Sequence, residues 1–244
     1  MLSPDETRRY ARHLVLKGIG GSGQQKLKAA RVLVVGAGGL GSPVIAYLAA
    51  AGVGELGVVD DDTVSLSNLQ RQVVHRTEDI GLPKTESAHG FAARLNPHVV
   101  FNEHRQRLAA ETADGVVSGY DLVLDGTDNF ETRQVVADAA ERAKLPLVSG
   151  AVSMFDGQVT VFAPHLANSS GRPNPRFADL YPITPDPEDL PSCEAVGVLG
   201  AVTGVIGTLM AMEAIKLLTG AGAPLIGRLL LYDGRDARFT EVAY

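Results

Sequence analysis

The chain has 244 residues, of which 45% are hydrophobic and 20% charged, so it is long enough to bury a sizeable core in one α/β domain. Its formal net charge of −6 provides no basic face, which argues against nucleic acid as a partner. The single cysteine, Cys193, excludes an intramolecular disulfide framework, and the polar start of the chain does not resemble a signal peptide, so we expect a cytoplasmic protein.

The predicted elements alternate after an N-terminal helical region. Residues 5–30 are predicted to be amphipathic helix, interrupted by a loop at Gly18–Gly23. Strands then alternate with helices, which favours a mostly parallel sheet with helices on both faces. The predicted strands are residues 31–36, 55–60, 98–104, 121–125 and 145–149, and the predicted helices are residues 41–51, 83–95, 108–117 and 130–143.

The pattern changes after residue 150. Residues 152–164 indicate strand with a turn at Phe155-Asp156-Gly157, which suggests antiparallel pairing in this part. Residues 164–193 form a long Pro-rich stretch without periodicity, and a loop of this length in a compact domain is usually functional or disordered. A final strand is predicted at Arg228–Tyr232, followed by a charged tail.

One segment raises the question of a membrane. Ala195–Met212 contains no charge, is long enough to span a bilayer, and carries the Gly200-x-x-x-Gly204 spacing of packed membrane helices. Its four glycines dilute the hydrophobicity, however, and Glu213 and Lys216 lie in the continuing helix. We therefore expect no membrane contact, but a helix buried in a large core or in a subunit interface.

The most informative motif follows the first predicted strand. It reads Gly36-Ala-Gly38-Gly39-Leu-Gly41, and Asp60 stands at the end of the next strand. Gly36 permits a tight turn, Gly38 lets the backbone approach a phosphate, and Gly41 allows close helix–strand packing. The start of the following helix favours an anion, and an acid at the Asp60 position can accept hydrogen bonds from ribose hydroxyls. The motif therefore predicts a nucleotide without saying which one.

Polar side chains cluster after the second predicted strand. Asn68, Gln70, Arg71 and Gln72 follow an acidic loop, and donors of this kind suit a polyphosphate. The guanidinium of Arg71 offers a planar fork to phosphate oxygens, so we favour phosphate contact for Arg71. For Asn68 the choice between phosphate contact and surface polarity stays open, as it does for Lys84 at a predicted helix start.

A second acidic site follows the fourth predicted strand. Ligands of open α/β sheets bind beyond the carboxyl ends of strands, and Asp60 and Asp128 both lie there. Asp128 is either the N-cap of the next helix or a carboxylate that holds Mg²⁺. We favour the metal role, because Asn129 can cap that helix equally well. Nothing local raises Arg12 above a surface residue, and Cys193 has no visible catalytic partner.

Taken together, these stretches resemble the ThiF/MoeB/HesA family, the bacterial relatives of ubiquitin-activating enzymes, and its MoeB-type members in particular. The matching stretches are Arg9-Tyr-Ala-Arg12-His, Gly36–Gly41, Asp60-Asp-Asp62-Thr-Val-Ser-Leu-Ser-Asn68-Leu-Gln-Arg71-Gln, Gly81-Leu-Pro-Lys84, Asp125-Gly-Thr-Asp128-Asn129 and Pro191-Ser-Cys193. The resemblance runs from about Arg9 to the last predicted strand.

The resemblance implies an enzyme that binds ATP and Mg²⁺ and adenylates the C-terminal Gly-Gly carboxylate of a ubiquitin-like sulfur carrier protein. Pyrophosphate leaves, and the product serves molybdopterin or thiamine synthesis or related sulfur transfer. The residues implied in catalysis are Arg12, which would act across a homodimer, Arg71, Lys84 and Asp128, which would hold Mg²⁺. The residues implied in nucleotide binding are Gly36, Gly38, Gly39, Gly41, Asp60, Asp62, Asn68, Arg71, Lys84, Asp128 and Asn129.

Further expectations come from positions at which this sequence differs from the family pattern. Many members bind zinc through two Cys-x-x-Cys pairs, but the first pair falls near Arg176 and Asp179 here, so we expect no zinc. Cys193 stands at the family's loop cysteine and is a candidate for sulfur transfer, while the sulfur donor would be a separate protein. We expect one adenylation domain with N-terminal helices (1–30), a nucleotide-binding half (31–150) and a carrier-binding and dimer half (151–244). The alternatives are an NAD-dependent oxidoreductase and a non-catalytic nucleotide-binding dimer.

Overall fold

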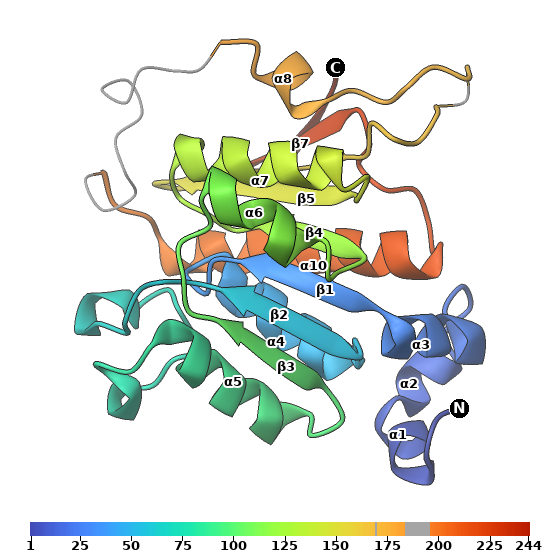
Figure 1. Cartoon of the computed structure of the whole chain (residues 1–244), viewed down its shortest axis with the longest axis vertical. Helices are drawn as coiled ribbons and strands as arrows, with labels where there is room; N and C mark the ends of the chain where they lie inside the picture. The colour runs from blue at the N-terminus through green and yellow to red at the C-terminus, as the bar shows by residue number, and fades with distance from the viewer. Residues whose placement is uncertain (169, 184–195) are drawn as a thin grey trace.

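The computed structural model describes residues 1–168, 170–183 and 196–244, and one eight-stranded sheet runs through this part of the chain (Figure 1). The strand order is β3-β2-β1-β4-β5-β6-β7-β8. The strands are β1 (Arg31–Val35), β2 (Glu55–Val59), β3 (Val100–His104), β4 (Leu122–Asp125), β5 (Leu147–Ser153), β6 (Asp156–Phe162), β7 (Arg228–Asp233) and β8 (Arg238–Ala243). The predicted α/β class is confirmed.

The sheet has a parallel part and an antiparallel part. Strands β3, β2, β1, β4 and β5 pair in parallel, whereas β6, β7 and β8 are antiparallel to their neighbours. The chain moves outward from β1 to β2 and β3, and then returns to place β4 on the other side of β1. This reversal between β1 and β4 is the point at which sheets of this type bind ligands.

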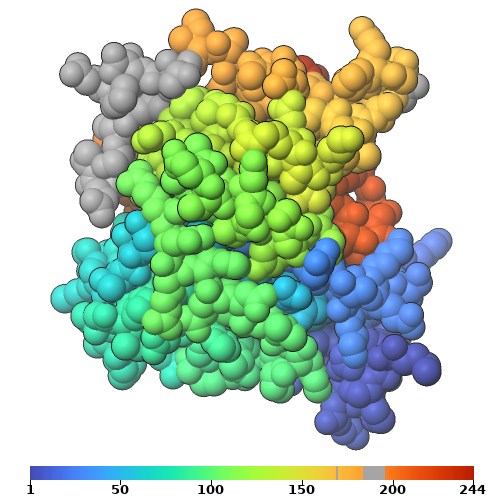
Figure 2. All heavy atoms as spheres, in the orientation of Figure 1, coloured from blue at the N-terminus to red at the C-terminus, as the bar shows by residue number. Residues whose placement is uncertain are grey.

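Helices cover both faces of the sheet. They are α1 (Pro4–Arg9), α2 (Ala11–Leu14), α3 (Gly20–Ala29), α4 (Gly41–Ala51), α5 (Lys84–Leu95), α6 (Ala110–Val117), α7 (Phe130–Arg142), α8 (Phe177–Leu180) and α10 (Gly200–Thr219), with short 3-10 turns η1 (Leu66–Asn68) and η2 (Thr77–Asp79). One apolar core lies under α4, α5 and α10, and a second lies under α6 and α7. In Figure 2 the green segments, which include α6 and α7, cover the sheet on the viewer's side.

Helix α10 packs on the sheet through small residues. A side chain at Gly207 would overlap Pro43 of α4, and side chains at Gly150 and Gly157 would overlap Met210 and Ile206 of α10. By length and composition this helix could cross a membrane, and 44% of its apolar window is buried within the fold. Because α10 contacts α4, β5 and β6, we describe it as a helix of the core. The expected burial in a core holds for one side of the helix, because Met212 is 53% exposed, and the expected subunit interface stays a prediction.

Three sequence predictions of local structure were wrong. The hairpin turn lies at Met154-Phe155, where Met154 has a φ of +50°, because Gly157 is needed for close packing against α10 rather than for the turn. The predicted charged tail forms edge strand β8, whose exposed residues carry little apolar signal. The predicted loop at Gly18–Gly23 ends early, because α3 begins at Gly20 and packs on α10.

Candidate functional site

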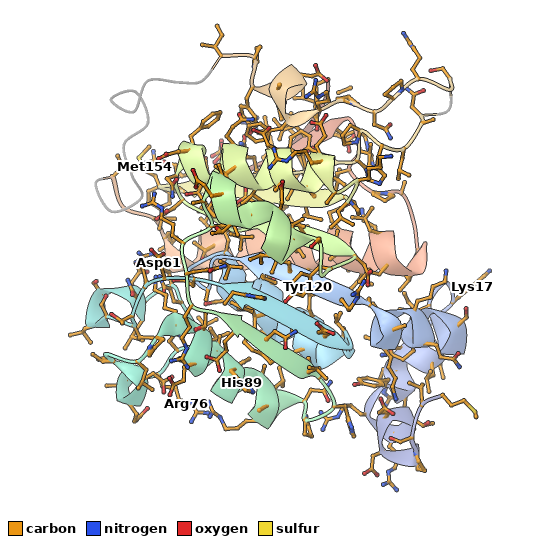
Figure 3. All side chains as sticks on the ribbon, viewed as in Figure 1. Lys17, Asp61, Arg76, His89, Tyr120 and Met154 are labelled. Carbon is orange, nitrogen blue, oxygen red and sulfur yellow. The ribbon has the colours of Figure 1, made fainter. Side chains whose placement is uncertain are left out.

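The predicted site residues gather where β1, β2 and β4 end. The chain after β1 is joined to β2 by a hydrogen bond from Gly36 N to Val59 O (2.8 Å). The chain after β4 is joined to β1 by a bond from Gly126 N to Val35 O (2.9 Å). Figure 3 places Asp61, from the segment after β2, at this end of the sheet and Lys17, from the N-terminal helices, at the opposite end.

The glycine motif forms an open backbone loop at the start of α4. Gly36 has a φ of +95°, which a side chain would strain, and a side chain at Gly41 would overlap the Gly36 carbonyl oxygen. Among the described residues, the N–H groups of Gly38, Gly39 and Leu40 have no hydrogen-bond acceptor. Free amides at a helix start bind anions. The predicted turn and packing roles of Gly36 and Gly41 are confirmed.

Asp60 holds the glycine loop in place. Its Oδ2 accepts a hydrogen bond from Ala37 N at 2.7 Å, and its Oδ1 accepts one from Asp62 N at 2.9 Å. Burial raises the pKa of the Asp60 carboxyl, while the nearby charge of Lys84 opposes that rise. Each carboxylate oxygen retains a lone pair, so the contact with Ala37 is compatible with the predicted hydrogen bond to a ribose hydroxyl.

Lys84 is a buried cation rather than an ordinary surface lysine. It is the first residue of α5, its side chain is 7% exposed, and its Nζ lies 2.7 Å from Asp62 Oδ2. A buried ammonium group needs an anionic partner, and Asp62 supplies one from an exposed position. Because the Asp62 carboxylate is exposed, the pair can open toward a ligand, and the structure brings both residues to the side of Asp60.

The polar cluster after β2 packs against the start of α10, where a side chain at Gly200 would overlap Gln70 O. Asn68 is buried, and its Oδ1 accepts a hydrogen bond from Ser65 N at 3.1 Å, so one end of this amide stabilises η1. The half-buried side chain of Arg71 donates to Ser67 O at 3.1 Å. A Cβ at Gly38 would lie 3.6 Å from Gln72 Nε2, which places the cluster beside the glycine loop.

The turn after β4 leaves Asp128 free. Asn129 is the N-cap of α7, and its Oδ1 accepts a hydrogen bond from Thr132 N at 2.9 Å. Asp125 is fully buried and fixes the turn by accepting from Thr127 N at 3.0 Å. Asp128 is exposed and has no hydrogen-bond partner among the described residues. The sequence argument that Asn129 can cap this helix is confirmed, and no hydrogen bond of its amide nitrogen occurs among the described residues.

Arg12 lies at the other end of the sheet. Its short helix α2 follows Tyr10, whose ring lies against Gly52 at the end of α4. Helix α4 has 11 residues, so its two ends are about 16 Å apart. The glycine loop lies at the start of α4. The structure therefore does not bring Arg12 to the nucleotide site of its own chain.

The sequence analysis missed His75. This imidazole is buried, and its Nε2 lies 2.9 Å from Ala37 O in the glycine loop. The only available signal was its position four residues after Arg71. Ser42 at the start of α4 and Thr85 at the start of α5 were also missed, and together with Gln72 each buries a polar atom without a partner among the described residues.

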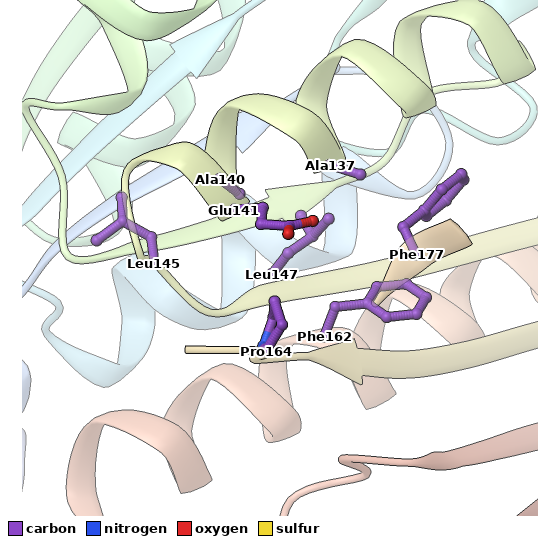
Figure 4. A pocket seen from close by; sticks show the side chains of 8 residues that line it. All are labelled: Ala137, Ala140, Glu141, Leu145, Leu147, Phe162, Pro164 and Phe177. Atoms are coloured by element: carbon purple, nitrogen blue, oxygen red, sulfur yellow. The ribbon is translucent and has the colours of Figure 1, made fainter. Parts of the chain in front are cut away.

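Other candidate positions contribute less. The described residues contain one acidic group with metal-ligand spacing, at Asp60–Asp62, and Cys193 lies outside the described residues. At the position of the family's first zinc pair, Arg176 forms an ion pair with Glu141 (2.8 Å) and Asp179 caps α8. A small pocket between α7 and the sheet is lined mainly by apolar side chains (Figure 4). No predicted site residue lines it.

Comparison with known proteins shows the family of the chain. A model of the ThiF family matches residues 10–244. "Probable adenylyltransferase/sulfurtransferase MoeZ" of Mycobacterium tuberculosis is 47% identical over 241 residues, which are 99% of this chain and 61% of MoeZ, so the chain spans less than two thirds of that relative. "Sulfur carrier protein adenylyltransferase" of Thermus thermophilus is 48% identical over 238 residues, which are 98% of this chain and 87% of the relative. A crystal structure of E. coli MccB with MccA-N7isoASN has a TM-score of 0.83 at 21% identity. The match covers 99% of this chain and 72% of that chain, and it supports the fold alone. The chain belongs to the ThiF family.

Proposed function

We propose that the chain is an adenylyltransferase that activates the C-terminal Gly-Gly carboxylate of a ubiquitin-like sulfur carrier protein with ATP. The carrier would serve molybdopterin or thiamine synthesis or related sulfur transfer. The names of the relatives, an adenylyltransferase/sulfurtransferase and a sulfur carrier protein adenylyltransferase, support this activity. The observation that carries the proposal is the combination, at one edge of the sheet, of three free loop amides with the buried cation Lys84.

The chemistry is an in-line transfer at the α-phosphate of ATP. A carrier carboxylate oxygen forms a new P–O bond, the bond to the bridging oxygen of the β-phosphate breaks, and pyrophosphate leaves with its electron pair. The amides of Gly38 and Gly39, with Lys84 and Arg71, would stabilise the negative charge on the phosphates. The remaining contribution is orientation of the two substrates, so no covalent bond to the protein is needed.

The adenine nucleotide and its metal fit the residues present. Gly38 has no side chain of its own, Gln72 Nε2 would lie 3.6 Å from a Cβ placed there, and Asp60 can hold the ribose. Asp128 is our proposed anchor for Mg²⁺, because its carboxylate is exposed and Asn129 caps the helix. A bound Mg²⁺ would neutralise phosphate charge and favour departure of pyrophosphate.

We further propose a homodimer in which Arg12 reaches the site of the partner subunit. Arg12 is exposed, and it lies too far from its own glycine loop to act there. The half-exposed side of α10, which carries Met212, offers apolar surface for a subunit contact. Absence of zinc, a separate sulfur donor, the three-part division of the chain, and a cytoplasmic location also remain proposals, as does a sulfur-transfer role for Cys193.

Carrier-dependent exchange between ATP and pyrophosphate tests the function. The wild-type chain should exchange label only with a Gly-Gly carrier present, and Asp128→Ala should lower the rate at least about 100-fold. A carrier without its terminal glycine is the matched control. No exchange with any cognate carrier would favour the non-catalytic alternative, and ATP-independent binding of NAD would favour the oxidoreductase alternative. Full exchange by Asp128→Ala would refute the metal assignment.

A further inference from the structure

His75 lies directly behind the glycine loop. Its side chain is 6% exposed, and both ring nitrogens are engaged. Nε2 lies 2.9 Å from Ala37 O, and Nδ1 lies 2.8 Å from Ser87 Oγ on α5. A carbonyl oxygen can only accept a hydrogen bond, so Nε2 must carry a proton. The ring therefore donates to the loop in either protonation state.

Both backbone polar groups of Ala37 form hydrogen bonds to side chains. Asp60 accepts from its N–H at 2.7 Å, and His75 donates to its C=O. Among the described residues every peptide bond is trans, and in a trans peptide the C=O and the next N–H point in opposite directions. Because the Ala37 C=O points inward to the buried imidazole, the Gly38 N–H points outward. That N–H is one of the three without an acceptor.

The groups around the ring favour a neutral imidazole. Burial lowers the pKa of His75 and the charge of Lys84 lowers it further, while the hydrogen bond to Ala37 and the charge of Asp79 act in the opposite direction. Asp79 accepts a hydrogen bond from Ser87 Oγ at 2.6 Å, and Arg94 also faces this carboxylate. Ser87 can turn its single hydroxyl hydrogen toward Nδ1 or toward Asp79. Either choice leaves the Nε2–H on Ala37.

We infer that His75 is a positioning residue of the nucleotide site, which orients the Ala37–Gly38 peptide so that the Gly38 N–H faces a phosphate of ATP. The inference rests on the proposed function, since it names ATP as the ligand. His75 itself touches no phosphate, because the loop lies between the imidazole and the site. Its contribution is to fix one donor before the nucleotide arrives, which spares the ligand the cost of ordering the loop.

Direct titration of ATP with Mg²⁺ against a set of variants tests this role. His75→Phe keeps the ring shape without the donor and should weaken ATP binding at least about tenfold. His75→Gln places an amide N–H near the Nε2 position and should stay within about threefold of wild type. Ser87→Ala removes the partner of Nδ1 and the bond to Asp79 but leaves the Nε2 donor, and it should also stay within about threefold. His75→Asn, whose amide is too short to reach Ala37, replaces the phenylalanine variant if that variant does not fold.

The outcomes separate this inference from the proposed function. Folded His75→Phe or His75→Asn with wild-type ATP affinity overturns the positioning role, as does a glutamine variant as weak as the phenylalanine one. A ligand-free crystal structure of His75→Asn gives a readout without ATP, and we expect the Ala37–Gly38 peptide to turn or to adopt two orientations. An unchanged peptide there overturns the inference even if exchange activity is present. Failure of the wild type to bind ATP would instead refute the proposed function.

Discussion

The two ends of the parallel strands differ in how completely their buried polar side chains are hydrogen-bonded. At the amino ends these groups are fully paired: Gln24 joins His13 to Ala51 O, and Asn96 joins the Tyr10 hydroxyl to Ala49 O. At the carboxyl ends several are not. The buried polar side-chain atoms that lack a hydrogen bond in the described residues are Ser42 Oγ, Gln72 Oε1, Thr85 Oγ1 and Arg133 Nε, which nevertheless lies 3.2 Å from Asp125.

This difference indicates that one end of the strands stabilises the fold and the other end binds a ligand. A buried polar group without a partner costs about 1–3 kcal/mol, so a fold keeps several of them together only where something else gains from them. The three atoms without any partner, and Arg133 Nε with its ion pair to Asp125, lie in or beside the segments that follow β1, β2 and β4, where the free amides of the glycine loop also lie. The amino ends hold the fold together, and the carboxyl ends leave donors and acceptors available for a ligand.

The largest expected difference between the two ends of the strands comes from a pair of glycine variants. An alanine Cβ would overlap a backbone carbonyl oxygen at Gly41, at the carboxyl ends, and at Gly54, at the amino ends. Each substitution should lower the free energy of unfolding by about 3 kcal/mol, because neither backbone can give way freely. Only Gly41→Ala should also weaken ATP binding, by at least about tenfold in the folded fraction. Chemical unfolding and ATP titration below the unfolding transition measure the two effects. Equal loss of ATP affinity in both variants would contradict the division.

Arg12 is the exception that the dimer proposal explains, since it lies at the amino ends but is expected to act at a nucleotide site. Arg12→Ala and Asp128→Ala should each be nearly inactive in carrier-dependent exchange. Mixed subunits should recover about a quarter of wild-type activity, because half of the dimers are mixed and one of their two sites is complete. Recovery is measured after subunit exchange has been verified with differently tagged chains. Exchanged subunits without activity would show that Arg12 does not act across the interface.

The smallest expected effect concerns acid stability at the amino ends. Hydrogen bonds from Lys28 and from the Ser3 backbone lower the pKa of buried Glu6 to about 2. A depressed carboxyl pKa stabilises the fold above the unfolded value near 4.5, and that contribution disappears as the pH falls toward 2. The melting temperature of wild type should therefore exceed that of Glu6→Gln at pH 6, with the gap closing between pH 4.5 and 2. A gap that stays constant with pH would contradict the ion pair, and ATP affinity at pH 7.5 should be unchanged.

Local patterns in the sequence predicted the parts of the site that depend on local geometry. Gly36 and Gly41 were assigned a turn and a close packing contact, and Asn129 was recognised as able to cap α7, because each role follows from neighbours within a few residues. The strand pattern also predicted the parallel part of the sheet. Here the spacing of residues was sufficient, and the family resemblance added the ligand.

Contacts between distant segments could not be predicted in this way. His75 meets Ala37 only because the chain returns from β2 past the glycine loop, and no periodicity encodes that return. The turn at Met154-Phe155 was misplaced for a related reason, since Gly157 serves the packing of Ile206 from a helix about 50 residues later. For Lys84 the sequence left the choice between a surface position and a phosphate contact open, because only the structure shows that its side chain is buried.

Hydrogen–deuterium exchange with and without ATP and Mg²⁺ tests the central claim, that the unpaired edge at the carboxyl ends is the nucleotide site. The account predicts slower exchange in peptides covering Gly36–Ser42 and Asp60–Gln72, because the free loop amides gain phosphate acceptors. Peptides covering Gly20–Arg31 and Asn96–Val100, at the amino ends, should be unchanged by the nucleotide in the isolated chain. Protection confined to the amino ends, or no protection of Gly36–Ser42 at a saturating ATP concentration, would contradict it.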